Sequence, residues 1–338
     1  MSLATVLVLL AALAVSSSLL VLVVFAVWWI DRFDREPIHL VALVFLWGAS
    51  VAPAASVMSL AALENALRWD PASSGPGGLA AVSLAGPFAE ELFKAIGVLL
   101  VVFLTSKFDN PTDGLVYGTA VGLGFAVSEN VVYGIGTGVA VDTVPMVLLT
   151  VVGRTLLSAG IHAVCSAVFG GFLGCAILSR RKLVRFGAVA FGFATAVAIH
   201  GLWNFTLTVV GPFAADGSPR SWLIALPALY LLYGATLAAF LLWEHHILKT
   251  QLAEEVSLEL APEWVLDIIP YYRRRVRSDW WPSRNERTVL SRLLTRIAFR
   301  KHAVRHLPPD EAAIASLEVV QLRQRLRMIL APGPEDTE

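Results

Sequence analysis

The sequence predicts an all-α protein, a polytopic membrane helix bundle of about seven transmembrane helices with a helical C-terminal cytoplasmic tail. Two observations favour this class: 57% of the 338 residues are hydrophobic, and only 15% are charged. A soluble domain carries about 25% charged residues, so this chain is too apolar to be covered by water. The composition excludes a soluble globular enzyme, a secreted disulfide scaffold and a disordered chain. The formal net charge is zero, so no nucleic-acid partner is expected.

Charged residues divide the chain into two parts. Residues 1–248 hold 24 of the 52 Asp, Glu, Lys and Arg residues, and residues 249–338 hold the other 28. We therefore expect a transmembrane core over residues 1–248, with its sequence motifs at 79–210. Over residues 249–338 we expect a cytoplasmic, amphipathic and basic helical tail, in which Asp310–Leu330 has the pattern of an amphipathic helix.

Seven apolar stretches are long enough to cross a bilayer, which takes about 20 residues per helix. They are residues 4–30, 38–66, 79–104, 113–134, 145–178, 183–210 and 221–247. The first stretch has no basic segment before it and is too long for a signal peptide, so we expect it to be a membrane span.

Basic residues in the short loops predict the orientation of the chain. With the N-terminus outside, seven of them fall in inner loops and two in outer loops, as the positive-inside rule requires. The inner residues are Arg32, Arg35, Lys107, Arg180, Arg181, Lys182 and Arg185, and the outer ones are Arg68 and Arg220. The prediction is a multi-pass protein of a bacterial cell membrane, with its C-terminus in the cytoplasm.

The spans between residues 79 and 210 carry ionisable and amide side chains within apolar sequence. They are Glu90, Glu91, Lys94, Glu129, Asn130, Arg154, His162, Ser166, His200 and Asn204. A charge at the bilayer centre costs about 2.5 to 3.5 kcal/mol on insertion scales. These residues are therefore expected to face the interior of the bundle, where they can share protons, partners or a metal ion.

Spacing predicts that these side chains meet at one site. Four pairs are four residues apart and therefore share a helix face. They are Glu90 with Lys94, Phe125 with Glu129, His162 with Ser166, and His200 with Asn204. Helices that each present one polar face build an internal site in a bundle. By position along the spans, this site lies in the outer half of the bilayer.

Two of these spans also contain regularly spaced glycines. They are Gly118 and Gly122 in the fourth span and Gly170 and Gly174 in the fifth. Small residues four positions apart let two membrane helices approach closely, so these spans are expected to pack against each other.

Four segments resemble, in order, the motifs of the PrsW family of intramembrane proteases. They read Glu-Glu-Leu-Phe-Lys at 90–94, Gly-Phe-Ala-Val-Ser-Glu-Asn at 124–130, His-Ala-Val-Cys-Ser at 162–166 and His-Gly-Leu-Trp-Asn at 200–204. The resemblance covers about residues 25–210 and implies a place in the group of CAAX prenyl endopeptidases and bacteriocin-immunity proteins. Those prenyl endopeptidases carry a histidine where this chain has Glu129.

The resemblance implies an intramembrane endopeptidase that hydrolyses a peptide bond of a membrane-anchored protein near the outer face. The family's namesake makes the first cut in an anti-sigma factor, a single-span membrane protein, so a similar substrate is expected here. Two other functions stay open from the residues alone, a proton- or cation-coupled transporter and a lipid hydrolase, because buried acids and histidines also build proton relays. The chain shows no internal repeat of the kind common in transporters.

Amide hydrolysis needs an activated water, a stabilised oxyanion and a proton for the leaving amine. In one arrangement Glu129, His162 and His200, with Glu90 or Glu91, bind Zn²⁺, and the remaining glutamate is the base. In the other, without metal, Glu90 and Glu129 share a proton and activate water, while His200 and Asn204 hold the oxyanion. We favour the metal. The supporting residues are Lys94 and Arg154, which orient the glutamates, with Asn130 and Ser166.

Overall fold

The structure, a computed structural model, describes residues 1–68, 75–105, 108–209, 220–277, 280–281 and 283–330, and the regular elements there are all helices. The predicted fold class is confirmed; Lys107, used for the orientation, lies outside the described residues. Two compact units form. The first comprises Met1–Ile30, Glu36–Ala176 and Phe186–Leu237, and the second comprises Asp31–Arg35, Ile177–Arg185 and Ala238–Glu338. The last segment of the second unit begins at Ala238, within the stretch 221–247.

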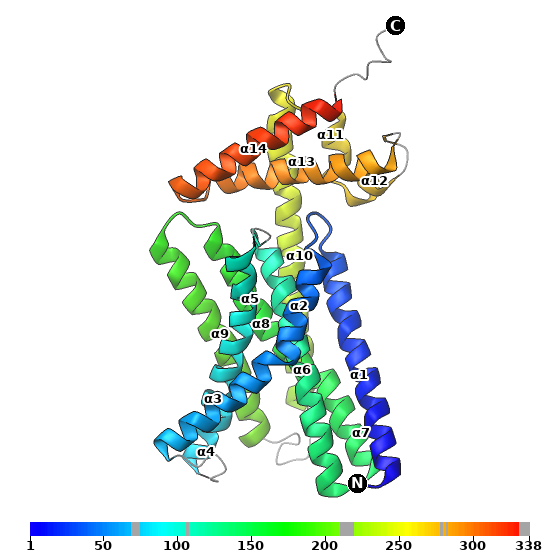
Figure 1. Cartoon of the computed structure of the whole chain (residues 1–338), viewed down its shortest axis with the longest axis vertical. Coiled ribbons are helices and arrows are strands. Elements are labelled where there is room, and N and C mark those ends of the chain that lie inside the picture. Colours follow the sequence, from blue (N-terminus) through cyan, green and yellow to red (C-terminus); the bar gives the residue numbers. More distant parts are fainter. Residues whose placement is uncertain (69–74, 106–107, 210–219, 278–279, 282, 331–338) are drawn as a thin grey trace. The chain divides into compact units, whose positions relative to one another are not determined.

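The first unit is a bundle of long helices joined by short connections (Figure 1). In chain order the helices are α1 (Leu3–Ile30), α2 (Ile38–Ala49), α3 (Val51–Leu67), α4 (Pro76–Ala80), η1 (Ala81–Ala85), α5 (Gly86–Leu104), α6 (Pro111–Val141), α7 (Val144–Gly153), η2 (Arg154–Ser158), α8 (Ala159–Ile177), α9 (Lys182–Val209) and α10 (Arg220–Ser257). The elements η1 and η2 are single turns of π-helix, each continuous with the α-helices beside it.

Six described helices are long and apolar enough to cross a membrane. The stretch predicted at 79–104 is also helical, over Pro76–Leu104, but it differs from the other six in carrying three charged residues close together in α5. Two helices are longer than the sequence predicted. α6 continues to Val141, because α1 and α7 pack against its glycine-rich last turns at Gly134. α10 continues to Ser257, because residues 248–257 contain no glycine or proline.

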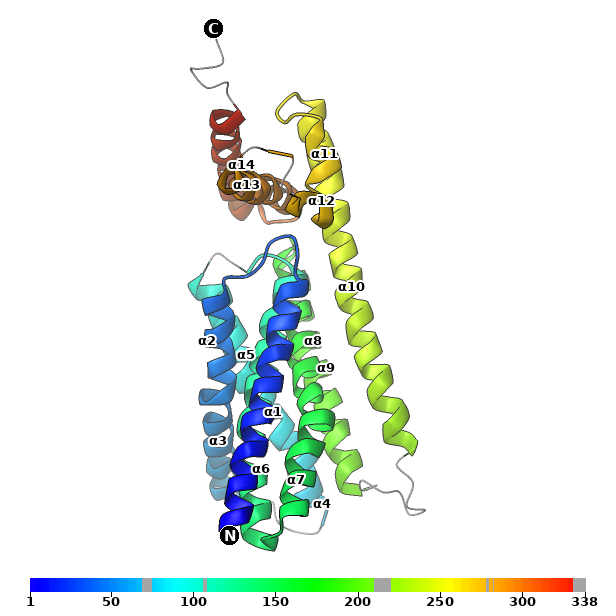
Figure 2. The same ribbon diagram turned by 90° about the vertical axis from the view of Figure 1, so that its right-hand side faces the viewer.

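α6 is the central helix of the first unit, with α1, α2 and α7 packed along it (Figures 1 and 2). A capping box fixes its beginning. The side chain of Asn110 accepts hydrogen bonds from the amides of Thr112 and Asp113, and Asp113 accepts one from the amide of Asn110. Pro111 then occupies the first turn, where its missing N–H has no partner to lose. Because the cap fixes the first residue of α6, it also fixes the height along the helix axis at which Glu129 lies.

Glycines bring α6 and α8 into backbone contact. A Cβ atom added at Gly114, Gly118 or Gly122 would overlap the carbonyl oxygen of Gly170, Ser166 or His162 respectively. The close approach predicted for these two spans is therefore confirmed. Because it places the backbones side by side, short side chains on α6 and α8 can reach one another.

The second unit is a small helical domain whose elements after α10 are α11 (Trp264–Ile268), α12 (Tyr272–Val276), α13 (Arg284–Val304) and α14 (Pro309–Leu330). Its core joins the end of α10 to α13 and α14 through residues such as Leu252, Leu294 and Leu326. The fully buried Glu255 is paired with Lys301 and Arg323. The predicted helical tail is confirmed, and α14 matches the predicted amphipathic run.

We predict that Gly118→Ala destabilises the protein by about 1 to 3 kcal/mol, because the new methyl group would force α6 away from α8. Gly136→Ala, in the same helix, is the matched control, since nothing lies within 4 Å of a Cβ atom there. Thermal unfolding of the purified proteins measures both. Equal unfolding temperatures for the two variants would contradict the close contact.

Candidate active site

The carboxylate of Glu91 is the centre of a buried polar cluster formed by α5, α8 and α9. Its Oε1 atom accepts hydrogen bonds from Lys94 Nζ and His200 Nδ1, each at 2.8 Å, and Ser166 Oγ lies 3.4 Å from its Oε2. Glu91 and His200 each expose 2% of their surface, and Lys94 none. The charges of Glu91 and Lys94 on this face of α5 are thus ion-paired and hydrogen-bonded to each other.

A second carboxylate, that of Glu129 on α6, binds the other histidine. Its Oε2 atom lies 2.5 Å from His162 Nε2 and 2.7 Å from Arg154 Nη2. Arg154 belongs to η2, and its guanidinium stacks 3.7 Å from the centre of the Tyr133 ring. Tyr133 was not predicted as part of the site, although it lies four residues after Glu129, on the same face of α6.

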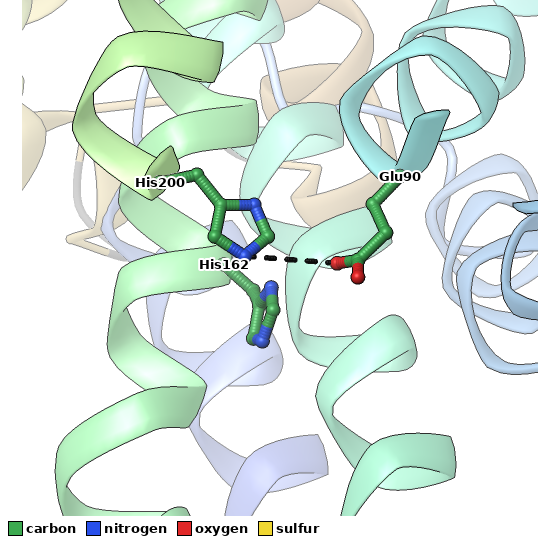
Figure 3. Close-up of side chains that lie close together, drawn as sticks. All are labelled: Glu90, His162 and His200. Carbon is green, nitrogen blue, oxygen red and sulfur yellow. Dashed lines mark ion pairs between the residues drawn. The ribbon is translucent and has the colours of Figure 1, made fainter. Parts of the chain in front are cut away.

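Glu90 and the two histidines converge on a shared space between the helices. Figure 3 shows Glu90 facing His200, with the ring of His162 directly beside them; Glu90 Oε2 lies 3.6 Å from His200 Nε2. The two imidazole rings are perpendicular, with centres 4.9 Å apart. Glu90 Oε2 is buried without a hydrogen-bond partner. Lys94 Nζ lies 3.7 Å from the same oxygen, an ion-pair distance that is too long for a hydrogen bond. A buried carboxylate oxygen in this position can accept a closer cation.

These three residues fit a divalent metal ion. One ligand atom from each of Glu90, His162 and His200 lies within 4.8 Å of the other two. Both histidines present one nitrogen to a carboxylate, His200 to Glu91 and His162 to Glu129, and this second contact is the one that orients metal-ligating histidines. The remaining nitrogen of His162, Nδ1, lies 3.0 Å from Lys94 Nζ. A metal ion bound at this nitrogen would replace the hydrogen bond from Lys94.

Two of the predicted site residues have their contacts elsewhere. Asn130 donates to Ser16 Oγ on α1 and to Thr155 Oγ1 on η2, each at 3.0 Å. Asn204 donates to the carbonyl oxygen of Val82 in η1, at 3.1 Å. Neither contact is to the glutamates or the histidines of the cluster.

Phe125 belongs to the cluster through its ring. The ring centre lies 4.0 Å from Lys94 Nζ and 5.3 Å from the ring centre of His162. A cation held over an aromatic face is stabilised where water is excluded. Phe125 precedes Glu129 by one helical turn, and that spacing was the available signal in the sequence.

Comparison with known proteins identifies relatives of this chain. A family described as PrsW family intramembrane metalloprotease matches residues 36–239. Protease PrsW of Bacillus subtilis is 32% identical over 181 residues, which are 53% of this chain and 75% of that protein. Protease PrsW of Geobacillus kaustophilus is 29% identical over 177 residues, 52% of this chain and 71% of that protein. No solved structure matches.

A helical membrane bundle with buried glutamates and histidines on four helices defines a membrane-embedded hydrolase. With the relatives above, the class is that of intramembrane peptidases, so the predicted protease activity is confirmed over the transporter and the lipid hydrolase. The chain belongs to the PrsW family of intramembrane metalloproteases. It acts on membrane protein in the bilayer, and its relatives place it in a bacterial membrane.

We predict that Glu91→Gln and Glu129→Gln each lower the cleavage rate by about 10- to 100-fold, because each removes the carboxylate that orients a histidine. Glu64→Gln, on α3 and outside the cluster, is the control and keeps full activity. The rate is measured per folded protein after purification, with unfolding temperature as a check on structure. Full activity in both cluster variants would contradict the assignment.

Proposed function

We propose that this protein uses Zn²⁺, held by Glu90, His162 and His200, to cut a single-span membrane protein near the outer face of the bacterial cell membrane. The observation that carries the proposal is the buried Oε2 of Glu90, which has no hydrogen bond and lies beside two carboxylate-oriented histidines. Two histidines and one carboxylate are a donor set used by catalytic zinc. The same order of motifs on four helices supports kinship with the CAAX prenyl endopeptidases.

The depth of the site supports cleavage near the outer face. At about 1.5 Å per residue, four cluster residues lie about 21 to 27 Å from the helix ends at Leu104, Pro111, Ile177 and Lys182. They are Glu90, Glu129, His162 and His200. Short loops join these ends in pairs, so they lie at one face of the bundle. A hydrocarbon core is about 30 Å thick, so the cluster is beyond its midpoint. With the N-terminus outside, as the basic loops favour, this is the outer half.

Each residue of the cluster has a distinct task in the proposed reaction. Bound zinc supplies Lewis-acid activation of water and of the scissile carbonyl. Glu91 and Glu129 hold the histidines, and Lys94 and Arg154 balance those two carboxylates. Both hydrogen bonds to Glu129 fall on Oε2, which leaves Oε1 to accept a proton from the attacking water. Glu129 then returns that proton to the leaving amine nitrogen, so the carboxylate is regenerated.

Substrate and cleavage side are tested together by labelling new protein amino termini in membranes of cells that express the wild type or Glu91→Gln. We expect termini that appear only with the wild type, in proteins with one membrane span, close to the outer end of that span. Termini on the cytoplasmic side would contradict the proposed orientation or depth. An anti-sigma factor among these substrates would extend the likeness to the family's namesake.

Metal content tests the zinc proposal directly. Protein purified without chelator is expected to carry about one zinc per chain, by the single-site arrangement above. His162→Ala and His200→Ala should each lower this to below about 0.1 equivalent, because metal affinity depends on each deprotonated ligand. Chelators should inhibit slowly and added Zn²⁺ should restore activity. Active wild-type protein with no bound metal would favour the glutamate-pair mechanism instead.

A further inference from the structure

A proline breaks the hydrogen-bond ladder just before the glutamates of α5. In η1 the amide of Gly86 donates five residues back, to the carbonyl oxygen of Ala81. In the same pattern the next donor, at position 87, would serve the carbonyl of Val82, but residue 87 is proline and has no N–H group. The Val82 carbonyl is therefore left without a partner in its own helix. Inside a bilayer such a group requires a donor from elsewhere in the protein.

Asn204 of α9 provides that donor. Its Nδ2 atom lies 3.1 Å from the Val82 carbonyl oxygen. One turn earlier, a Cβ atom at Gly201 would overlap the carbonyl oxygen of Ser83, so a glycine there permits the two helices to touch. His200, next in line on α9, donates to Glu91. One segment of α9 thus contacts both the break in the helix and the glutamate that follows it.

We propose that Asn204 is a positioning residue: by satisfying the Val82 carbonyl it fixes where α5 begins, and so directs Glu90 and Glu91 toward the histidines. The inference rests on the proposed function only in taking these glutamates as site residues. It gives Asn204 a role that requires no contact with the substrate, in contrast to a donor to the oxyanion.

Ser128 of α6 provides a comparison at a carbonyl of α2, a helix without site residues. Ala49 is the last residue of α2, so no amide of that helix serves its carbonyl, and Ser128 Oγ donates to it. Asn204 and Ser128 therefore each satisfy a carbonyl that has no partner in its own helix. Only the Val82 carbonyl lies just before the glutamates of α5, so only the loss of Asn204 should disturb the beginning of α5.

The test is a double-mutant cycle in zinc-loaded protein reconstituted in nanodiscs, with Asn204→Ala and Pro87→Ala. Cleavage is measured on the single-span protein found by the amino-terminal labelling. Alone, Asn204→Ala should lower kcat about three- to twentyfold, the range expected for one interhelical hydrogen bond in a membrane, with KM unchanged. Pro87→Ala restores an amide at position 87 that can serve the freed carbonyl, so in that background the loss should shrink to less than about twofold.

An equal loss of kcat in both backgrounds would overturn the proposal, since a donor to the oxyanion stays essential whichever amides α5 has. Ser128→Ala should lower the unfolding temperature, and any effect of it on kcat should be the same in the wild-type and Pro87→Ala backgrounds. Glu91→Gln distinguishes an error in the site assignment from an error in the role of Asn204. If that variant stays active, the site assignment itself is wrong; if it is inactive while the cycle is additive, only the role of Asn204 is wrong.

Hydrogen exchange gives a second readout that needs no substrate. In Asn204→Ala the amides of Gly86, Phe88 and Ala89 should exchange faster than in the wild type, and Pro87→Ala should restore their protection. In Ser128→Ala the same amides should be unaffected. Unchanged exchange at these amides in Asn204→Ala would also overturn the proposal, even if Pro87→Ala proves too unstable for kinetics.

Discussion

The burial of charge in an apolar bundle is the constraint on which the rest of this structure depends. A carboxylate in hydrocarbon is stable only when donors and countercharges surround it. Glu91 has Lys94 on its own helix and His200 on another, and Glu129 has Arg154 and His162. Those contacts require four helices to lie within side-chain reach of one another. The glycine contacts of α6 with α8 are the means by which the bundle becomes that tight.

The fold could be predicted to a large extent, because membrane spans depend on the length and hydrophobicity of apolar stretches, which can be read directly from the sequence. Apolar stretches of about 20 residues form helices in a bilayer whatever their partners. Helix ends were less predictable. The end of α6 was expected near residue 134, where glycines lower helix propensity, but neighbouring helices keep it helical to Val141. Such packing depends on contacts with other helices, which cannot be predicted from the sequence of α6 alone.

The sequence predicted which residues form the site better than it predicted the contacts among them. Spacing placed His162 and His200 on inward faces, and the structure brings both to the cluster. Which carboxylate faces which imidazole nitrogen depends on the rotation of each helix about its axis, and no pattern in one helix fixes that. Glu129 was predicted as a metal ligand, whereas its contacts in the structure are with His162 and Arg154.

The balance of charge explains why a site suited to a cation also contains two basic residues. Lys94 compensates Glu91 and Arg154 compensates Glu129, at 2.8 and 2.7 Å, whereas the nearest charged nitrogen to Glu90 is Lys94 at 3.7 Å. Counted formally, three carboxylates and two cations leave one negative charge, which we assign to Glu90, whose buried Oε2 has no hydrogen bond. A divalent ion with neutral histidines changes that single negative charge to a single positive one. Without the two basic residues the site would carry three negative charges in an apolar bundle, and burying them would cost far more free energy when no metal ion is bound.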